Sequence, residues 1–340
     1  MVPRPPPREG QLGFVYAPPI RIQGISVAGE QTVVHIPEFD LVFDIGLCPR
    51  AALTASVVAL SHAHMDHSGG IPYYFSQRVF QKLGPGRVVC HPEIAQPLRQ
   101  MMRGWVDLER QRTPHEVEAL DPGSTCRLRP NLLLKAIEVS HTVPSLGFAV
   151  IETRSKLKPE LLSLPQDRLR ELRMSGEEIT RQVEIPLVAY TGDTEHGPFL
   201  YGEEFVRAPV VITECTFFEE DHRDRARTGK HLHVEDLRLL LDAWSAPDVI
   251  VIHVSRRTNL AFARERLAAL CGPHASRVHL LMDHRANRAR YERQVAEHGG
   301  GGAALNAAGA EAAAPSVKGE NAGAMEEDHA PTATDAAVEE

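Results

Sequence analysis

The sequence predicts an α/β sandwich with helices on the outside of its sheets. Two observations lead to this fold class: short runs rich in β-branched residues recur along the chain, and segments with the apolar spacing of amphipathic helices lie between several of them. Strands and helices that alternate in this way pack as layers around a common core. No linker-like segment interrupts residues 19–298, so we expect one domain there.

The expected strands share a short, apolar, β-branched composition and are bounded by turn residues. They cover residues 32–36, 41–45, 57–61, 87–90, 132–139, 147–153, 185–191, 210–213, 249–253 and 278–281. Glu38, Phe39 and Asp40 join the first two strands as a hairpin turn. Apolar residues at helical spacing predict helices over residues 92–103, 233–244 and 259–270.

The two ends of the chain differ from the rest in composition. Residues 1–18 form a proline-rich lead-in, and residues 299–340 consist largely of Ala, Gly and Glu, so we expect the tail to be disordered. The tail holds eight acidic residues and one lysine, a net charge of −7, which leaves about −1 of the chain's net charge of −8 for the first 298 residues. The folded part therefore lacks a wholesale basic surface for nucleic acid.

Composition also restricts where the protein is expected to work. No run of about 18 apolar residues suggests a transmembrane helix, and prolines break the start MVPRPPPREG, which lacks the apolar segment of a secretory signal. The five cysteines are odd in number and scattered, with no CxxC pair. This pattern disfavours a disulfide scaffold or a structural zinc knuckle, and we expect a cytoplasmic protein with no membrane partner.

The strongest chemical signal is the segment SHAHMDHSGG at residues 61–70, which follows a predicted buried strand. Its three histidines and one aspartate are poor core material, because every buried polar atom would need a partner. His62 and His64 can converge on one metal ion, while Asp66 and His67 turn toward a second. Imidazole nitrogens with carboxylate oxygens suit Zn²⁺, with Mn²⁺ or Fe²⁺ as alternatives.

Three more polar residues, His141, Asp193 and His253, stand at the ends of later apolar strands. Open α/β sheets collect binding groups at the carboxyl ends of their strands. The expected ligand sets are His62, His64 and His141 for one ion and Asp66, His67 and His253 for the other, with Asp193 as a bridge. Such sets leave metal positions open for water, which is typical of a catalytic centre.

The HxHxDH spacing of His62, His64, Asp66 and His67 resembles the signature of the metallo-β-lactamase fold. The later site residues follow in the order of that fold, and the resemblance covers about residues 20–290. It implies an αββα sandwich with a dinuclear metal centre between the sheets. Because this fold hosts many reactions, the resemblance implies fold and metal rather than substrate.

Finer features resemble one branch of that fold, ribonuclease Z, the tRNA 3′-processing endonuclease, in its short plant-type form. The matching segments are HTVPSLGF at 141–148, TGDT at 191–194, ECTF at 214–217, KHLH at 230–233 and IHVSRR at 252–257. The resemblance implies that Glu214 and His231 are a catalytic pair in which the histidine assists proton transfer. It also implies a homodimer.

The expected reaction is metal-assisted hydrolysis of a phosphodiester. Asp66 would orient the attacking hydroxide or accept its proton, and His231 would protonate the leaving oxygen. His233 is the alternative donor, two residues further along the chain. Arg256 and Arg257 stand just past His253, where an arginine can hold a phosphate. The basic segment 222–230 is either a phosphate contact or a solvated loop.

The chain departs from ribonuclease Z at two places. Residues 21–40 lack the glycine-rich first strand and the substrate loop of that family, and residues 152–185 stand where the family has a long, lysine-rich arm that grips tRNA. We expect a short helical insert instead of the arm. Residues 152–184 hold seven basic and seven acidic residues, and such a neutral stretch is a poor phosphate clamp.

These observations predict an RNA substrate, a tRNA precursor cut at its 3′ end. The alternative substrates are a small phosphodiester, a lactone or a sulfate ester. The alternative from another class is a non-catalytic nucleic-acid-binding or scaffold protein, which would have no need of seven convergent polar ligands.

Overall fold

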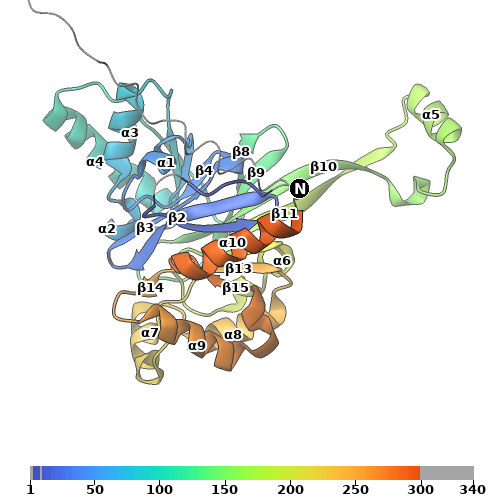
Figure 1. The fold of residues 1–340 in the computed structure, drawn as a ribbon. Helices are drawn as coiled ribbons and strands as arrows, with labels where there is room; N and C mark the ends of the chain where they lie inside the picture. Colours follow the sequence, from blue (N-terminus) through green and yellow to red (C-terminus); the bar gives the residue numbers. More distant parts are fainter. Residues whose placement is uncertain (1–2, 8–9, 299–340) are drawn as a thin grey trace, which may run out of the picture. The chain divides into compact units, whose positions relative to one another are not determined.

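Two β-sheets form the centre of the computed structural model, which describes residues 3–7 and 10–298 (Figure 1). The expected disordered tail, residues 299–340, lies outside the described residues. The first sheet has the strand order β1 (Gly13–Ala17), β2 (Ile20–Ala28), β3 (Gln31–Ile36), β4 (Leu41–Phe43), β5 (Val57–Ala59), β6 (Arg87–Cys90) and β7 (Glu116–Ala119), and β14 (Val254–Ser255) pairs with β2. The second has the order β15 (Val278–Leu280), β13 (Asp248–Ile252), β12 (Val210–Glu214), β11 (Thr180–Tyr190), β10 (Leu146–Leu157), β9 (Leu132–Glu138) and β8 (Thr125–Arg129).

The main core lies between the sheets and follows from alternation along the strands. In β4, Leu41 and Phe43 point into this core with Phe148 and Tyr190 of the second sheet, whereas Val42 belongs to a separate outer cluster. Successive side chains of a strand face opposite sides of its sheet, so each strand serves two cores. This explains why the central strands are apolar throughout rather than alternating.

Helices cover the outer face of each sheet. On the first sheet α3 (Ile71–Phe80) and α4 (Pro92–Glu109) supply apolar residues to the outer cluster, and on the second α6 (Glu203–Arg207), α8 (Val234–Ala243) and α9 (Leu260–Cys271) do the same. The remaining helices are α1 (Arg50–Leu53), α2 (Met65–Ser68), α5 (Gln166–Met174), α7 (Arg223–Gly229) and α10 (His284–His298). The layers are therefore α/β/β/α, and the predicted sandwich is confirmed. Among the described residues, no helix is long and apolar enough to cross a membrane.

All ten expected strands and the three expected helices are present, and a 3₁₀ turn at Pro37–Phe39 joins β3 to β4 as expected. The strands missed from the sequence are β1, β2, β7, β8 and β14. The last three are short or rich in charged residues, as strands near sheet edges often are. β1 lies inside the stretch expected to be a lead-in, and its five residues are all buried.

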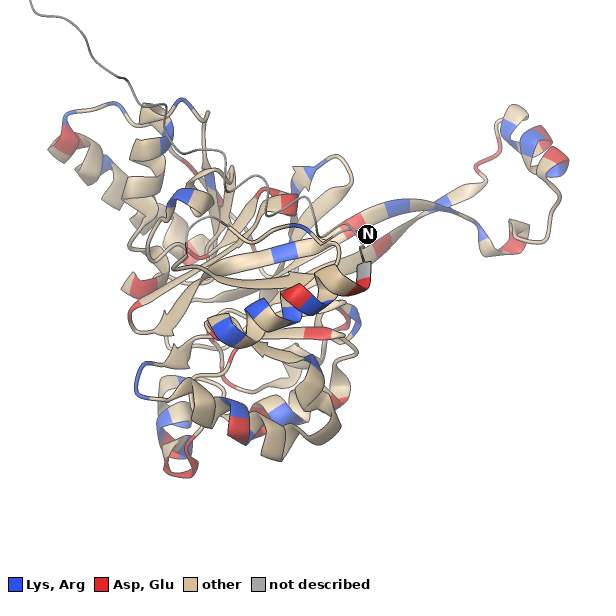
Figure 2. Cartoon of the chain, viewed as in Figure 1, with Lys and Arg blue, Asp and Glu red and all other residues tan. Residues whose placement is uncertain are grey.

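Residues 152–185 hold a helix as expected, α5, but the expectation of a short insert in place of an arm is wrong. β10 pairs with β9 only as far as Glu152, but its pairing with β11 continues to Leu157 opposite Thr180. The outer halves of β10 and β11 thus form a two-stranded ribbon beyond the sheet, with α5 at its tip, and we call residues 153–184 the arm (Figure 1). Its seven basic and six acidic residues are interspersed along it, so its charge is close to balanced, as predicted (Figure 2).

The buried His35 of β3 predicts how stability depends on pH. Burial lowers the pKa of His35 from 6.5 to about 4, and its Nδ1 lies 3.0 Å from Gln23 Nε2. The unfolded chain binds this proton below pH 6.5 and the folded chain does not, so stability falls as pH drops from 6.5 toward 4. Between pH 7 and 5 we expect this group to cost about 2 kcal/mol of unfolding free energy.

Urea denaturation of the wild type and of His35→Gln at both pH values measures this contribution. The difference between the two proteins isolates His35 from the other titrating groups. Parallel losses in the two proteins would contradict the assignment to His35.

Candidate metal centre

The predicted ligands come together at one edge of the sandwich. His62 follows β5 of the first sheet, while His141, Asp193 and His253 follow β9, β11 and β13 of the second. β11, β12 and β13 run parallel to one another and β9 runs in the same direction, so their carboxyl ends meet at this edge. Asp66 and His67 lie on the short helix α2.

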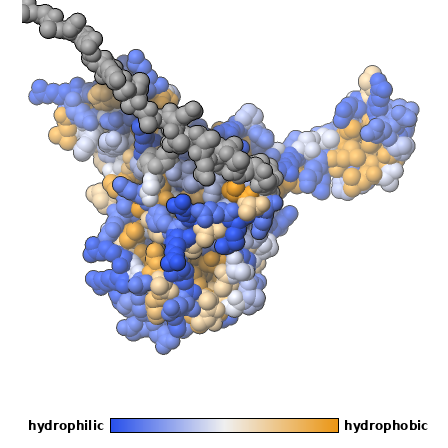
Figure 3. All heavy atoms as spheres, in the orientation of Figure 1, coloured by the Kyte–Doolittle hydropathy of each residue, from blue (hydrophilic) through white to orange (hydrophobic). Residues whose placement is uncertain are grey.

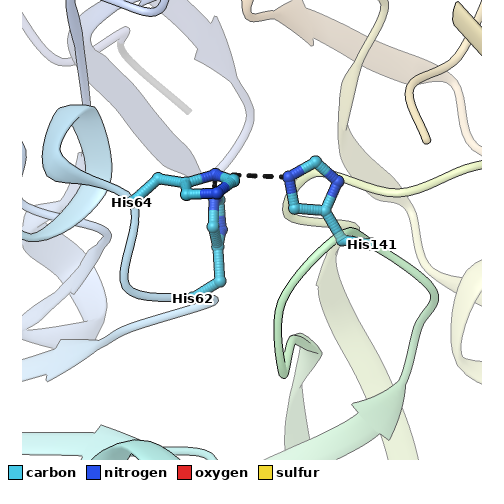
Figure 4. A group of neighbouring side chains, drawn as sticks. All are labelled: His62, His64 and His141. Atoms are coloured by element: carbon cyan, nitrogen blue, oxygen red, sulfur yellow. Dashed lines mark hydrogen bonds between the residues drawn. The ribbon is translucent and has the colours of Figure 1, made fainter. Parts of the chain in front are cut away.

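The first predicted set, His62, His64 and His141, converges as three ring nitrogens (Figure 4). His62 Nε2 lies 3.0 Å from His64 Nδ1, which in turn lies 3.3 Å from His141 Nε2. Figure 4 shows His141 facing the other two from the opposite side. Burial lowers the pKa of all three imidazoles, which favours the neutral form that binds metals.

The second predicted set, Asp66, His67 and His253, is also assembled, and Asp193 lies between the two sets. Asp193 Oδ2 is 3.2 Å from His253 Nε2, 3.3 Å from His67 Nε2 and 3.8 Å from His62 Nε2. Burial lowers the pKa of His67, but the carboxylates of Asp193 and Asp44 outweigh it and hold that pKa well above the ordinary value. The pocket therefore favours positive charge at this position.

Asp44, which the sequence analysis missed, orients two of the histidines. Its fully buried carboxylate accepts hydrogen bonds from His67 Nδ1 at 2.8 Å, from Ser61 Oγ at 2.8 Å, from the Ser61 amide at 2.7 Å and from the Tyr190 hydroxyl. Because Ser61 Oγ donates to Asp44, it accepts from His62 Nδ1 at 2.9 Å. The outward nitrogens of His62 and His67 thus donate to the surrounding side chains, which directs both Nε2 atoms toward the centre.

The histidines from the second sheet are oriented in the same way. Thr216 Oγ1 donates to Glu214 Oε2 at 2.7 Å and so accepts from His253 Nδ1 at 2.9 Å. His141 Nδ1 donates to the carbonyl of Lys230 at 3.1 Å. These contacts again direct the Nε2 atoms inward.

These residues fit a metal ion. Among the described residues, His67 Nε2 and Asp193 Oδ1 are buried atoms without a hydrogen-bond partner. Burying such atoms unpaired costs about 1–3 kcal/mol each, whereas a bound cation would satisfy both. The donors are imidazole nitrogens and carboxylate oxygens, the set that Zn²⁺ and similar transition metals accept.

Backbone packing behind the motif depends on glycine. A Cβ at Gly46 would lie 1.8 Å from the Asp66 carbonyl oxygen, and one at Gly70 would lie 2.6 Å from that of Ile45. Only residues without a side chain allow the α2 segment to pack so closely against the end of β4. His253 itself has a φ of +57°, an uncommon conformation for a residue other than glycine that is found preferentially at functional sites.

Glu214 and His231 form a hydrogen-bonded pair beside the metal ligands. Glu214 is fully buried at the end of β12, and its Oε1 accepts from His231 Nδ1 at 2.9 Å and from the Thr194 amide at 2.9 Å. The His231 ring lies between those of His141 and His253, with centroid distances of 5.0 and 5.2 Å. Burial lowers the pKa of His231, but Glu214 outweighs it and raises the pKa to about 9.

His233, the alternative donor, has a different environment. Its ring caps the N-terminus of α8, with Nδ1 accepting from the Glu235 amide at 3.4 Å, while its Nε2 donates to the Glu219 carbonyl at 3.0 Å. Both ring nitrogens are therefore used within the fold, and His231 is the histidine that faces the candidate ligands.

The predicted substrate arginines lie on the exposed turn after β14. Arg256 forms an ion pair with Glu30 at 2.8 Å, and the Arg257 amide lies 3.4 Å from Ser255 Oγ. The basic segment 222–230 is largely paired, since Arg223 contacts Glu235, Arg227 lies 3.2 Å from Asp224 and Lys230 lies 3.2 Å from Glu195. The structure thus favours the solvated-loop interpretation for most of that segment.

Residues 47–254 match the β-lactamase superfamily domain, and the chain belongs to this superfamily in its metallo-β-lactamase fold. A metallo-β-lactamase-fold protein of Bacillus subtilis, YhfI, shares the fold at 12% identity with a TM-score of 0.54, over 75% of this chain and 93% of that protein.

Within the superfamily the chain is related to the tRNase Z proteins of plants. It is 30% identical to tRNase Z TRZ1 of Arabidopsis thaliana over 264 residues, 76% of this chain and 94% of that protein. It is 32% identical over 258 residues to the chloroplastic tRNase Z TRZ2 of the same plant, 73% of this chain and 71% of that protein. It is also 35% identical to the nuclear ribonuclease Z of Triticum aestivum, over 48% of this chain and 92% of that protein.

Proposed function

We propose that this protein is a metal-dependent phosphodiesterase that cuts RNA at the 3′ end of tRNA precursors. The observation that carries the proposal is the Glu214–His231 pair beside two sets of clustered His and Asp ligands. A buried carboxylate that keeps a histidine protonated next to a metal centre suits a reaction that releases an alkoxide. The relationship to proteins named tRNase Z supports RNA as the substrate.

In this proposal two Zn²⁺ ions bind per chain, with Mn²⁺ or Fe²⁺ as alternatives. His62, His64 and His141 would hold one ion and Asp66, His67 and His253 the other, with Asp193 as a further ligand between the two sets. Metal ions bound there would activate water and neutralise phosphate charge.

The chain's own residues orient the attack and protonate the leaving group. Asp66 Oδ2 is fixed by the Gly29 amide at 2.8 Å, which lets the carboxylate hold the attacking water in one direction. His231, held by Glu214, gives a proton to the leaving oxygen. Arg256 and Arg257 contact the substrate backbone, and Arg256 does so by exchanging Glu30 for a phosphate.

The arm leaves the sandwich at the ends of β10 and β11 opposite to those that carry the centre, so a substrate that contacts both would have to be large. The nearly balanced charge of the arm instead favours the alternative substrate, a small phosphodiester. Its basic residues are matched by almost as many acidic ones, so the arm has little net positive charge with which to bind a phosphate backbone. We further propose that the protein acts as a homodimer in the cytoplasm. Two of the relatives are named for other compartments, the chloroplast and the nucleus.

A paired assay on zinc-loaded protein tests the function. The substrates are a tRNA precursor with a 3′ trailer and bis(p-nitrophenyl) phosphate, and a variant in which residues 158–179 are replaced by Asn-Gly tests the arm. Leu157 and Thr180 are direct cross-strand partners, so a two-residue turn can close the ribbon. We expect the wild type to cleave both substrates and the shortened variant to retain only the small diester.

If the wild type hydrolyses only the small diester, RNA is not its substrate and a small phosphodiester is the better assignment. Activity on neither substrate would contradict phosphodiesterase chemistry and direct the search to lactones and sulfate esters.

A further inference from the structure

Three loops that carry candidate site residues are joined by one group of polar side chains at the rim of the centre. Ser140 precedes His141, Glu195 lies two residues after Asp193, and Lys230 precedes His231. We call Ser140, Glu195 and Lys230 the rim cluster. Ser140 and Glu195 were not singled out from the sequence, and Lys230 was considered there only within the KHLH segment and the basic segment 222–230.

The rim cluster is connected through both side chains and backbone. Lys230 Nζ donates to Ser140 Oγ at 3.0 Å and lies 3.2 Å from Glu195 Oε1, and Ser140 Oγ donates to the same oxygen at 2.5 Å. The Glu195 amide donates to the Ser140 carbonyl at 2.9 Å. The loop that carries His141 is thus fastened to the other two loops immediately before the histidine.

Lys230 has an unusual backbone. It ends α7 with a φ of +52°, a left-handed conformation in which glycine is the default residue and a residue with a Cβ atom is strained. Its carbonyl is the group that accepts from His141 Nδ1 at 3.1 Å. Unlike a glycine, Lys230 can fix the position of its carbonyl, because its side chain is hydrogen-bonded to Ser140 on the loop that carries His141.

We propose that the rim cluster positions the His141 imidazole for metal binding, with Lys230 as a positioning residue; this rests on the proposed metal centre. The side chains of Lys230 and Glu195 are 38% and 36% exposed, so their ion pair by itself contributes little to overall stability. We expect the ion pair to act instead on the orientation of His141, the member of the first ligand set that follows a strand of the second sheet. Partners that orient a ligand typically change metal affinity by about 10–100-fold.

Zinc competition with a chromogenic chelator, together with thermal unfolding of the metal-free protein, tests the proposal. We expect Lys230→Met and Glu195→Lys each to weaken zinc affinity by about tenfold. The exchange variant Lys230→Glu/Glu195→Lys should recover most of that loss, because it restores the ion pair with reversed polarity. Lys230→Gly relieves the backbone strain and removes only the anchor, so it should fold and still bind zinc more weakly.

The matched control is Lys135→Met, which removes a lysine–carboxylate pair of 2.6 Å with Glu204 on β9 and α6. It should leave zinc affinity at the wild-type value. If every rim variant binds zinc as tightly as the wild type, the proposed role of the cluster is wrong but the metal centre still stands. The same conclusion follows if each loss of zinc affinity is matched by an equal loss of stability in the metal-free protein. Wild-type protein that retains no zinc would overturn the metal centre and this inference with it.

Discussion

Replacing His64 by alanine is expected to remove metal from the centre and to abolish hydrolysis without unfolding the protein. His64 Nδ1 lies within 3.0–3.3 Å of both other nitrogens of the first set, so its loss opens that set on one side. Because the ring is only half-buried, the substitution leaves no large core cavity. Residues that only orient a metal ligand typically change metal affinity by about 10–100-fold. Because His64 is itself a candidate ligand, we expect its loss to lower metal affinity by at least about 100-fold.

Metal content by inductively coupled plasma mass spectrometry and diester turnover measure the effect. His274→Ala is the control, because this histidine makes a partly exposed pair with Asp242 at 3.1 Å, away from the centre. It should retain metal and activity. His64→Ala with wild-type metal content would contradict the assignment of the first ligand set.

Much of the fold could be predicted because the central strands are short runs rich in β-branched residues, a composition typical of buried strands. The arm could not be predicted, because its outer segments, Thr153–Leu157 and Thr180–Glu184 in β10 and β11, mix charged and polar residues. Most residues of these segments are exposed and none is fully buried, so no apolar period marks the ribbon. Its hydrogen bonds come from a partner strand more than 20 residues away, which single-sequence patterns do not show.

The candidate ligands could be predicted because they stand at the ends of strong strands in a recognisable spacing. Asp44 was missed because the sequence predicts a strand over residues 41–45, which places Asp44 inside the strand; β4 in fact ends at Phe43, and no motif surrounds Asp44. The pairings of the basic segment could not be read from the sequence. Arg223 meets Glu235 and Lys230 meets Glu195 only because the loops fold side by side.

Replacing His231 by alanine is expected to slow turnover strongly while leaving metal content unchanged. The ring hydrogen-bonds through Nδ1 to the buried Glu214, and its loss removes the proposed proton donor but none of the six histidine and aspartate groups of the two ligand sets. Losing a general acid costs about 10²–10⁴-fold in rate. The effect should be largest for a poor leaving group, the ribose alkoxide, and small for p-nitrophenolate, which needs little protonation to depart.

His233→Ala is the matched control, two residues away on the same segment. Because its ring caps α8, we expect a stability loss of about 1 kcal/mol with turnover retained. The measurement is kcat for an RNA substrate and for bis(p-nitrophenyl) phosphate, with metal content determined on the same samples. Only a proton donor distinguishes the two leaving oxygens. If His231→Ala slows both substrates to a similar extent, or if the variant loses metal, the ring acts at the metal centre and not on the leaving group.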